Sequence, residues 1–343
     1  MAYTTINKST DYFNTKLYTG TGSTASITGV GFQPDFSWIK VRNNTDNHVV
    51  FDAVRTAGKR LEPNINAAEA TISNELTAFN SDGFSIGGAD RVNRNNDTYA
   101  SWNWKANGAG SANTAGSINS TVSANTTSGF SIVSWTGTGA NATVGHGLGV
   151  APKAVIIKSL SATYEWRSYF SPIGAGKYMV LNETYAQATG SNFMNDTAPT
   201  SSVFSLGNGT TPNASGVTYI AYCFADVKGY SKIGSYVGNG NADGIFVYTG
   251  FKPAFILFKV TSTGDSWQLI DTKRDTFNSG SELVLQPDLN QAEADNTRAD
   301  ILSNGFKIKT TNVSVNGSGQ SYIYMAFAEA PLVGSNNVPC TAR

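Results

Sequence analysis

Two aspartates at matching positions are the residues best suited to chemistry in this sequence. Asp52 and Asp271 each follow a short apolar segment, and an arginine lies three residues later in both cases, Arg55 and Arg274. A pair of carboxylates can hydrolyse a glycosidic bond, with one as general acid and the other as base or nucleophile. The same spacing suits an ion pair that holds a loop. We favour the ion pair, because residues 167–170 carry no acid at the matching place in the middle of the chain.

The few histidines and cysteines of the sequence are poorly placed for chemistry. His48 and His146 are far apart and have no paired cysteines, so neither a zinc site nor a Ser-His-Asp triad is predicted. Cys223 lies in an apolar segment, where a buried thiol is expected, and Cys340 lies near the end of the chain, where exposure is expected. Their spacing does not indicate a disulfide. We therefore predict no catalytic residue, no metal site, no cofactor and no enzymatic activity.

Tryptophans offer a different kind of site. Trp166 and Trp267 follow corresponding apolar segments and lie among loop-forming polar residues. Most aromatic rings in small β-sandwiches belong to the core. An exposed indole ring beside Asn and Asp side chains would instead form a platform for a sugar ring. Trp166 and Trp267 are therefore our candidate ligand-binding residues, for a glycan or a protein partner.

The chain repeats itself three times. Segments 31–40, 149–158 and 250–259 share a glycine, a proline and a final lysine at the same spacing, and further landmarks recur around them in the same order. A unit of about 100 residues is long enough to bury a core of its own. We predict three tandem domains and a short tail. Their bounds are 1–107, 108–226, 227–330 and, for the tail, 331–343. The repeats leave open whether the units form a line or a pseudo-threefold cluster.

Two kinds of segment depart from the general pattern. Residues 107–128 are almost all Gly, Ala, Ser, Asn and Thr, which predicts a linker or a surface excursion. Residues 67–76 and 291–302 are the segments that could form helices, with Asn66 and Asn290 as N-caps.

The remaining pattern predicts β-structure. Segments 154–158 and 255–259 are short, β-branched or aromatic and bounded by Gly and Pro, as expected of strands buried on both faces. Residues 99–104 alternate between polar and apolar, and Asn-Gly and Asp-Gly turns are frequent. We predict an all-β fold of three related β-sandwiches with at most short helices. Jelly-roll and immunoglobulin-like topologies both remain open.

Composition excludes several classes of partner. Lys and Arg total 24, Asp and Glu also total 24, and charged residues are only 14% of the chain. A neutral chain has no electrostatic attraction to a phosphate backbone, so we predict no nucleic-acid binding. The first residues lack the pattern of a secretory signal, and no apolar run approaches the roughly 20 residues of a membrane helix. We expect neither Sec-type export nor membrane insertion.

Several segments resemble a known family. The segments that carry the likeness are 2–13, 31–40, 79–84, 99–106, 329–332 and 337–340. They are similar to an uncharacterised repeat domain that is widespread in tailed phages of marine bacteria, especially cyanophages. The resemblance implies a structural protein of the virion, often associated with the tail or a fibre, and it supplies no catalytic residues.

The residues and the resemblance together predict a non-enzymatic virion protein. Our first hypothesis is a tail fibre, spike or tail-tip component that attaches to the host surface or helps tail assembly. The alternatives are a capsid decoration or head-fibre protein, and a polysaccharide-binding or polysaccharide-degrading tail protein. Expected partners are other virion proteins and a host surface glycan. A homo-oligomer is also expected, with a trimer favoured because exposed sandwich edges suit closed threefold assembly. Such a protein, made in the host cytoplasm, needs no export signal because lysis releases it.

Overall fold

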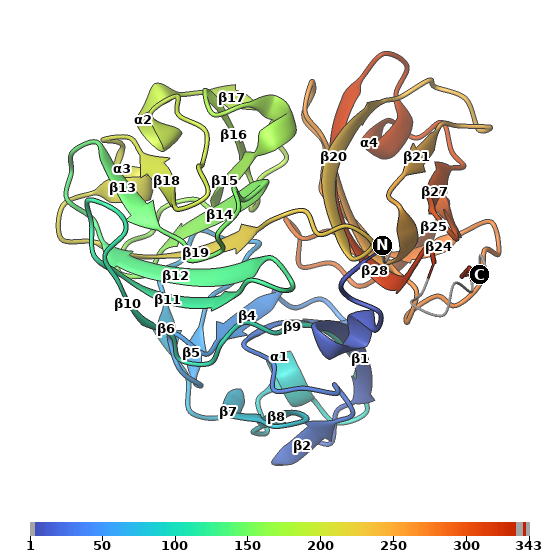
Figure 1. Cartoon of the computed structure of the whole chain (residues 1–343). Helices are drawn as coiled ribbons and strands as arrows, with labels where there is room; N and C mark the ends of the chain where they lie inside the picture. Colours follow the sequence, from blue (N-terminus) through green and yellow to red (C-terminus); the bar gives the residue numbers. More distant parts are fainter. Residues whose placement is uncertain (1–3, 334–338, 341–343) are drawn as a thin grey trace.

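Three β-sandwiches cluster around a common centre (Figure 1). The structure, a computed structural model, describes residues 4–333, 339 and 340, so most of the predicted tail lies outside the described residues. Nearly all regular structure is β-strand, joined by turns and by helices of about one turn. The predicted all-β fold is confirmed. No helix in the described ranges is long and apolar enough to cross a membrane.

The first sandwich packs a four-stranded antiparallel sheet against a three-stranded one. Its elements are η1 (Ser9–Asp11), β1 (Phe13–Thr19), β2 (Ala25–Thr28), β3 (Phe36–Val41), β4 (Val49–Asp52), β5 (Lys59–Arg60), β6 (Ala70–Thr71), β7 (Leu76–Asn80), β8 (Gly83–Ile86), α1 (Asp90–Asn93) and β9 (Thr98–Trp104). The large sheet has the order β1-β9-β3-β4 and the small sheet β2-β8-β7. Strands β5 and β6 form a separate ribbon.

The second sandwich has the same plan with a wider large sheet. Its elements are β10 (Ser111–Asn113), β11 (Ser120–Asn125), β12 (Phe130–Thr136), β13 (Ala142–Gly145), β14 (Ala154–Ser159), β15 (Arg167–Phe170), η2 (Ser171–Ile173), β16 (Lys177–Val180), β17 (Ala188–Thr189), α2 (Ser191–Met194), β18 (Val203–Leu206), α3 (Thr210–Asn213) and β19 (Thr218–Phe224). The large sheet runs β10-β11-β12-β19-β14-β15-β16-β17, and β13 pairs with β18.

The segment expected as a linker, 107–128, is therefore not a linker. It forms β10 and β11, and β11 pairs with the edge of β12 along its whole length. An edge strand needs few apolar side chains, and Ile118 and Val122 supply them from an otherwise polar sequence.

The third sandwich returns to the plan of the first. Its elements are β20 (Ser231–Val237), β21 (Phe246–Tyr248), β22 (Phe251–Val260), β23 (Gln268–Asp271), β24 (Glu282–Val284), β25 (Ala294–Asn296), β26 (Ala299–Leu302), β27 (Gly305–Ile308), α4 (Val313–Asn316) and β28 (Ser321–Pro331). The large sheet has the order β20-β28-β22-β23 and the small sheet β21-β27-β26, and β24 pairs with β25.

The two predicted helices are wrong. Residues 67–76 contain β6 and the start of β7, and residues 291–302 contain β25 and β26, so Asn66 and Asn290 cap no helix. The carboxylates of Glu69 and Glu293 bind buried arginines instead. Such tertiary contacts override a local helix propensity, which is a weak preference.

Each large sheet is buried on both faces. Strands β3 and β14 are buried throughout, as are the last six residues of β22. One face of each sheet packs on the small sheet of the same unit, forming a separate core for each sandwich. The opposite faces meet in a central cluster built from all three units. The units therefore form a pseudo-threefold cluster, which the sequence had left open.

Three aromatic rings lie at the middle of this cluster. Trp104, Phe224 and Phe327 hold the same position in β9, β19 and β28, and all are buried. The ring centroids are 6.2 Å apart for Trp104 and Phe224, 5.7 Å for Phe224 and Phe327, and 5.4 Å for Trp104 and Phe327. Each ring thus contacts the other two edge to face. We call this set the aromatic triangle.

The aromatic triangle predicts cooperative unfolding of the whole chain. Phe327→Ala should lower the free energy of unfolding by about 3–5 kcal/mol, because a fully buried ring is lost from a core that all units share. Urea unfolding followed by tryptophan fluorescence and by far-UV circular dichroism should give coincident transitions. Val313→Ala, at an exposed side chain of α4, is the control and should change stability by less than about 0.5 kcal/mol. Separate unfolding of the third unit would contradict this prediction.

Candidate functional site

The acids singled out in the sequence lie in buried ion pairs. Arg55 Nε donates to Asp52 Oδ2 at 2.5 Å, and Arg274 Nε donates to Asp271 Oδ2 at 2.5 Å. The arginine backbone N–H donates to the other carboxylate oxygen, at 2.9 and 2.8 Å. All four side chains are almost fully buried. The predicted ion pairs are confirmed.

Each ion pair also reaches a neighbouring unit. The Tyr222 hydroxyl donates to Asp52 Oδ2 at 2.8 Å, joining the second unit to the first. The Trp102 indole N–H donates to Asp271 Oδ2 at 3.0 Å, joining the first unit to the third. Burial alone would lower the pKa of Arg55, but Asp52 and other neighbours raise it above its ordinary value. The guanidinium therefore remains charged.

The third junction is apolar at the same positions. Asp52 and Asp271 pair with Phe36 and Phe255 in the sheet register, and the matching partner in the middle unit is Phe170. In the third unit, Met325 holds the position that Trp102 and Tyr222 hold in the first and second units. Phe170 and Met325 both belong to the central cluster. The acid and its donor are thus replaced together, which explains the missing acid of the middle unit.

Three matching lysines form a second set of buried charges. Lys40, Lys158 and Lys259 end the repeated apolar segments, and all are fully buried. Lys158 Nζ donates to the Asn66 carbonyl of the first unit at 3.1 Å, and Lys259 Nζ donates to the Thr184 carbonyl of the second at 2.9 Å. Burial lowers the pKa of these lysines, to about 8, 7 and 8 in chain order.

Such an amine is a potential nucleophile, since a lysine with a lowered pKa can form Schiff bases. None of the three is accessible, however, because each side chain is fully buried. Their geometry suits a structural role: Lys158 and Lys259 donate to carbonyl groups of a neighbouring unit, and Lys40 donates to the Val41 and Asn44 carbonyls of its own unit. The sequence showed these lysines at the end of each repeated apolar segment, but it did not show that they would be buried.

The two candidate tryptophans lie at these junctions and not at the surface. Trp166 and Trp267 are each 1% exposed. Trp166 Nε1 donates to the Glu62 carbonyl of the first unit at 3.0 Å, and Trp267 Nε1 donates to the Val180 carbonyl of the second at 3.0 Å. The prediction of an exposed glycan platform is wrong, because packing between units covers both rings. They do occupy corresponding positions, as expected.

The histidines are placed in different units. His48 Nδ1 accepts a hydrogen bond from Trp38 Nε1 at 2.9 Å, and burial together with the charge of Lys40 lowers its pKa. His146 Nε2 lies 3.1 Å from the Thr200 carbonyl, and burial lowers its pKa too. Within the described residues, no group of three His, Cys, Asp or Glu side chains could hold a metal ion.

Both cysteines are free. Cys223 is buried, as predicted, and burial raises the pKa of its thiol to about 12. Cys340, expected to be exposed, is partly buried, and its thiol donates to the Ser303 carbonyl at 2.9 Å. Neither thiol is an activated nucleophile, because burial also raises the pKa of Cys340.

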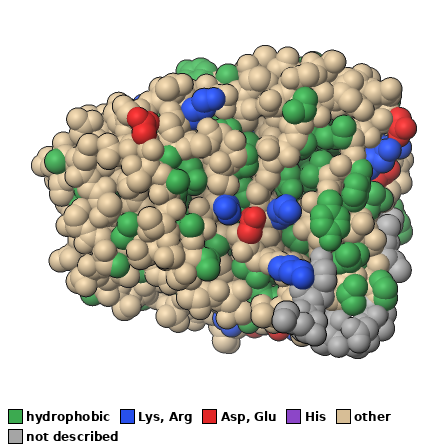
Figure 2. All heavy atoms as spheres, turned by 45° about the horizontal axis from the view of Figure 1, so that its top comes forward, with side chains coloured by type: hydrophobic (Ala, Val, Ile, Leu, Met, Phe, Trp, Pro, Cys, Tyr) green, Lys and Arg blue, Asp and Glu red, His purple; other side chains and the backbone are tan. Residues whose placement is uncertain are grey.

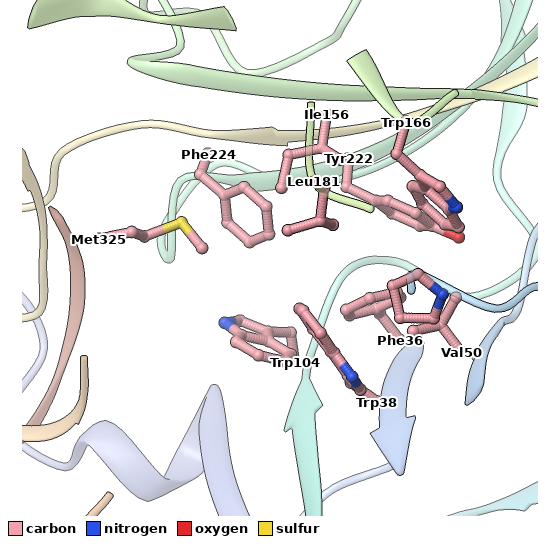
Figure 3. A pocket seen from close by; sticks show the side chains of 11 residues that line it. Phe36, Trp38, Val50, Trp104, Ile156, Trp166, Leu181, Tyr222, Phe224 and Met325 are labelled. Atoms are coloured by element: carbon pink, nitrogen blue, oxygen red, sulfur yellow. The ribbon is translucent and has the colours of Figure 1, made fainter. Parts of the chain in front are cut away.

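A small cavity lies beside the aromatic triangle (Figure 3). It measures about 20 Å³ and is surrounded by large apolar side chains of the first two units and by Met325 of the third. The space is sufficient for one water molecule, but its lining offers a water no hydrogen-bond partners. We interpret it as a packing void at the point where three sheets meet.

The junction chemistry predicts how single and joint replacements will differ. Asp52→Asn should lower the free energy of unfolding by about 3–5 kcal/mol, because the buried Arg55 loses its main counter-charge. The triple variant Asp52→Phe, Arg55→Ile and Tyr222→Met copies the apolar junction and should lose less. Urea midpoints measure both, and Asp271→Asn is a second single variant that should behave like the first. A triple variant less stable than Asp52→Asn would contradict the interpretation.

The lysines predict a dependence of stability on pH. Because burial disfavours the charged amine, the unfolded chain binds more protons than the folded chain above pH 7, up to the ordinary lysine value. The free energy of unfolding should therefore rise between pH 7 and about pH 8.5, below the range where Cys223 and the buried tyrosines would act oppositely. Urea midpoints across this window test the rise, and Lys158→Met should reduce it. A flat or falling profile would contradict the prediction.

Comparison with known proteins gives a family without an assigned role. No curated protein matches this sequence. One family description, a domain of unknown function named DUF7483, matches residues 8–331 and so spans all three sandwiches in a single match. That span agrees with three units that share one central core. The chain belongs to the DUF7483 family.

Proposed function

We propose that this chain is a non-enzymatic structural protein of a phage virion, a tail fibre, spike or tail-tip component that serves host attachment or tail assembly. The observation that carries the proposal is the use of buried ionisable groups. Asp52, Asp271, Lys158 and Lys259 all join one unit to another, and none faces an open cleft. Buried charges used in this way stabilise the arrangement of the three units, as expected of a structural protein.

Stability without disulfides also supports a particle component. Both cysteines are free, so rigidity comes from the aromatic triangle, the ion pairs and the lysines. A protein assembled in a reducing cytoplasm and released by lysis must be stabilised in this manner.

The pseudo-threefold arrangement supports a partner with threefold symmetry. A single chain that places three similar sandwiches around one axis can match a trimeric fibre or hub, as a homotrimer could. The proposed partners are other virion proteins. A host surface glycan would be bound by exposed loops, since Trp166 and Trp267 are buried. The predicted homotrimer remains a prediction, and its test is the mass of the purified protein in solution.

A capsid decoration protein is the second candidate, favoured by the same symmetry, because local threefold axes also occur on capsids. Cryo-electron microscopy of the virion that carries this protein separates the two. Density for the three-sandwich body on the tail or its fibres is the expected result. Density on the capsid would make the protein a decoration factor, and its absence from purified virions by mass spectrometry would overturn the structural role.

Enzymatic activity is tested separately. Purified protein incubated with host surface polysaccharide is expected to leave its chain length unchanged, as measured by size-exclusion chromatography. Shortening of the polysaccharide would overturn the non-enzymatic part of the proposal. A variant with both Asp52→Asn and Asp271→Asn would then show whether those acids are responsible.

A further inference from the structure

The large sheet of the third unit ends in an open edge strand, whose counterpart in the middle unit is covered by a further strand. Strand β20 pairs with β28 on one side, and no other strand of the described residues pairs with it. The matching strand of the middle unit, β12, carries β11 on that same side. The two strands correspond because Tyr236 of β20 and Trp135 of β12 hold the same position. Their rings stack on Tyr322 and Tyr219, with centroids 4.9 and 5.4 Å apart.

The end of this edge offers backbone groups for pairing. Ser231 N–H donates to the Val227 carbonyl and Ile233 N–H donates to Asp226 Oδ1, so both amides point away from β28. Because backbone groups alternate in direction along an antiparallel strand, Ser235 and Val237 also direct their amides to the open side. Both residues are exposed.

The middle unit shows what fits such an edge. Its segment 116–125 pairs with β12 through β11, and Ile118 makes a parallel bridge to Val144 of the facing small sheet. Ile118 and Val122 are buried in the core of that sandwich. The segment thus closes the open side between the two sheets.

The three units differ in the side chains along this side. In each unit we compare three side chains along this side. One is at the end of the first strand of the large sheet, and two are on the first strand of the small sheet. The sets are Thr19, Ser26 and Thr28 in the first unit, Thr136, Thr143 and Gly145 in the second, and Val237, Phe246 and Tyr248 in the third. The first unit presents hydroxyls, and the second is covered by its own segment. The third presents apolar side chains.

This apolar edge is accessible. Val237 is 57% exposed, Phe246 47% and Tyr248 49%. Hydrophobic side chains gather over the third unit on the right part of the face in Figure 2. The first unit also carries Lys16 on its edge strand, a charge of the kind that discourages strand pairing, and the matching residue of β20 is Gly234. Exposed apolar edges of this kind mark interaction sites.

We propose that the open side formed by β20 and β21 docks one extended segment of a partner protein. The segment would be uncharged, with Ile or Val at two positions four residues apart, as in residues 116–125, and would add a strand to the sheet. Next to this side, a groove of about 430 Å³ lies between the ends of β20 and β28 and Pro172, Ile173 and Lys177 of the second unit. In the middle unit a single extended segment, and not a second sandwich, covers the matching side, so we assign this side to a partner segment and not to a second copy.

This inference deepens the proposed function by naming the surface through which a neighbouring virion protein would join. Its test needs only the isolated chain. The probe is a synthetic peptide of residues 116–125, added to isotope-labelled protein and followed by NMR. Shift changes should fall on β20 and β21. The double variant Val237→Lys and Phe246→Lys should weaken binding at least tenfold, and a peptide with Ile118→Asp and Val122→Asp should not bind.

The matched control is Thr19→Lys with Ser26→Lys, at the same positions of the first unit. All four replaced side chains are exposed, so both variants should keep the urea midpoint of the parent protein. Equal binding by the third-unit variant, or shifts confined to other strands, would overturn the site. Absence of both peptide binding and self-association would do the same. Concentration-dependent dimers that the third-unit variant abolishes would identify a second copy as the occupant and overturn the partner segment. Each of these results leaves the virion location of the chain unaffected.

Discussion

The contact of three aromatic rings, one from each unit, is the constraint on which the rest of the structure depends. Trp104, Phe224 and Phe327 can meet only if each large sheet turns a second apolar face toward the axis. Strands such as β3 and β14 are therefore buried on both faces, in contrast to the half-solvated strands of an isolated antiparallel sandwich. Any charge near the axis must then be paired, because an unpaired buried ion is very costly. The ion pairs and the lysine contacts follow from the packing of the rings.

The junctions between units are similar in geometry and different in chemistry. Two are closed by an aspartate that accepts a hydrogen bond from a ring of the adjacent unit, and one is closed by Phe170 and Met325. Replacing buried ion pairs by apolar groups is often neutral or stabilising, so stability alone does not explain the polar junctions. We infer instead that they help to fix how the units are arranged. Three related sandwiches could associate in more than one order, and an aspartate that met an apolar neighbour would keep its arginine but lose the hydrogen bond from the adjacent unit. The mixture of junctions thus selects one arrangement.

Local features of the sequence predicted local structure well. The repeated apolar segments were identified as doubly buried strands from their residue types, and the ion pairs were identified because both partners lie within one turn of chain. Errors arose wherever a distant unit decides the outcome. Trp166 and Trp267 are adjacent to polar loops in sequence, yet another unit covers them. Glu69 and Glu293 favour helix locally, yet they bind buried arginines. Segment 107–128 has the composition of a linker, but an edge strand requires only a few apolar contacts, which Ile118 and Val122 provide.

Covalent joining of the three units has a consequence for how their edges can diverge. A homotrimer made from one gene must display every edge three times. An edge that pairs with other strands would then occur in triplicate and promote fibre formation. In a single chain each copy accumulates its own substitutions, and here one edge carries hydroxyls and a lysine, one is closed by its own chain and one is apolar. A body with nearly threefold internal packing therefore has a polarity that a symmetric trimer lacks. It can be oriented by a neighbour that binds on one side only.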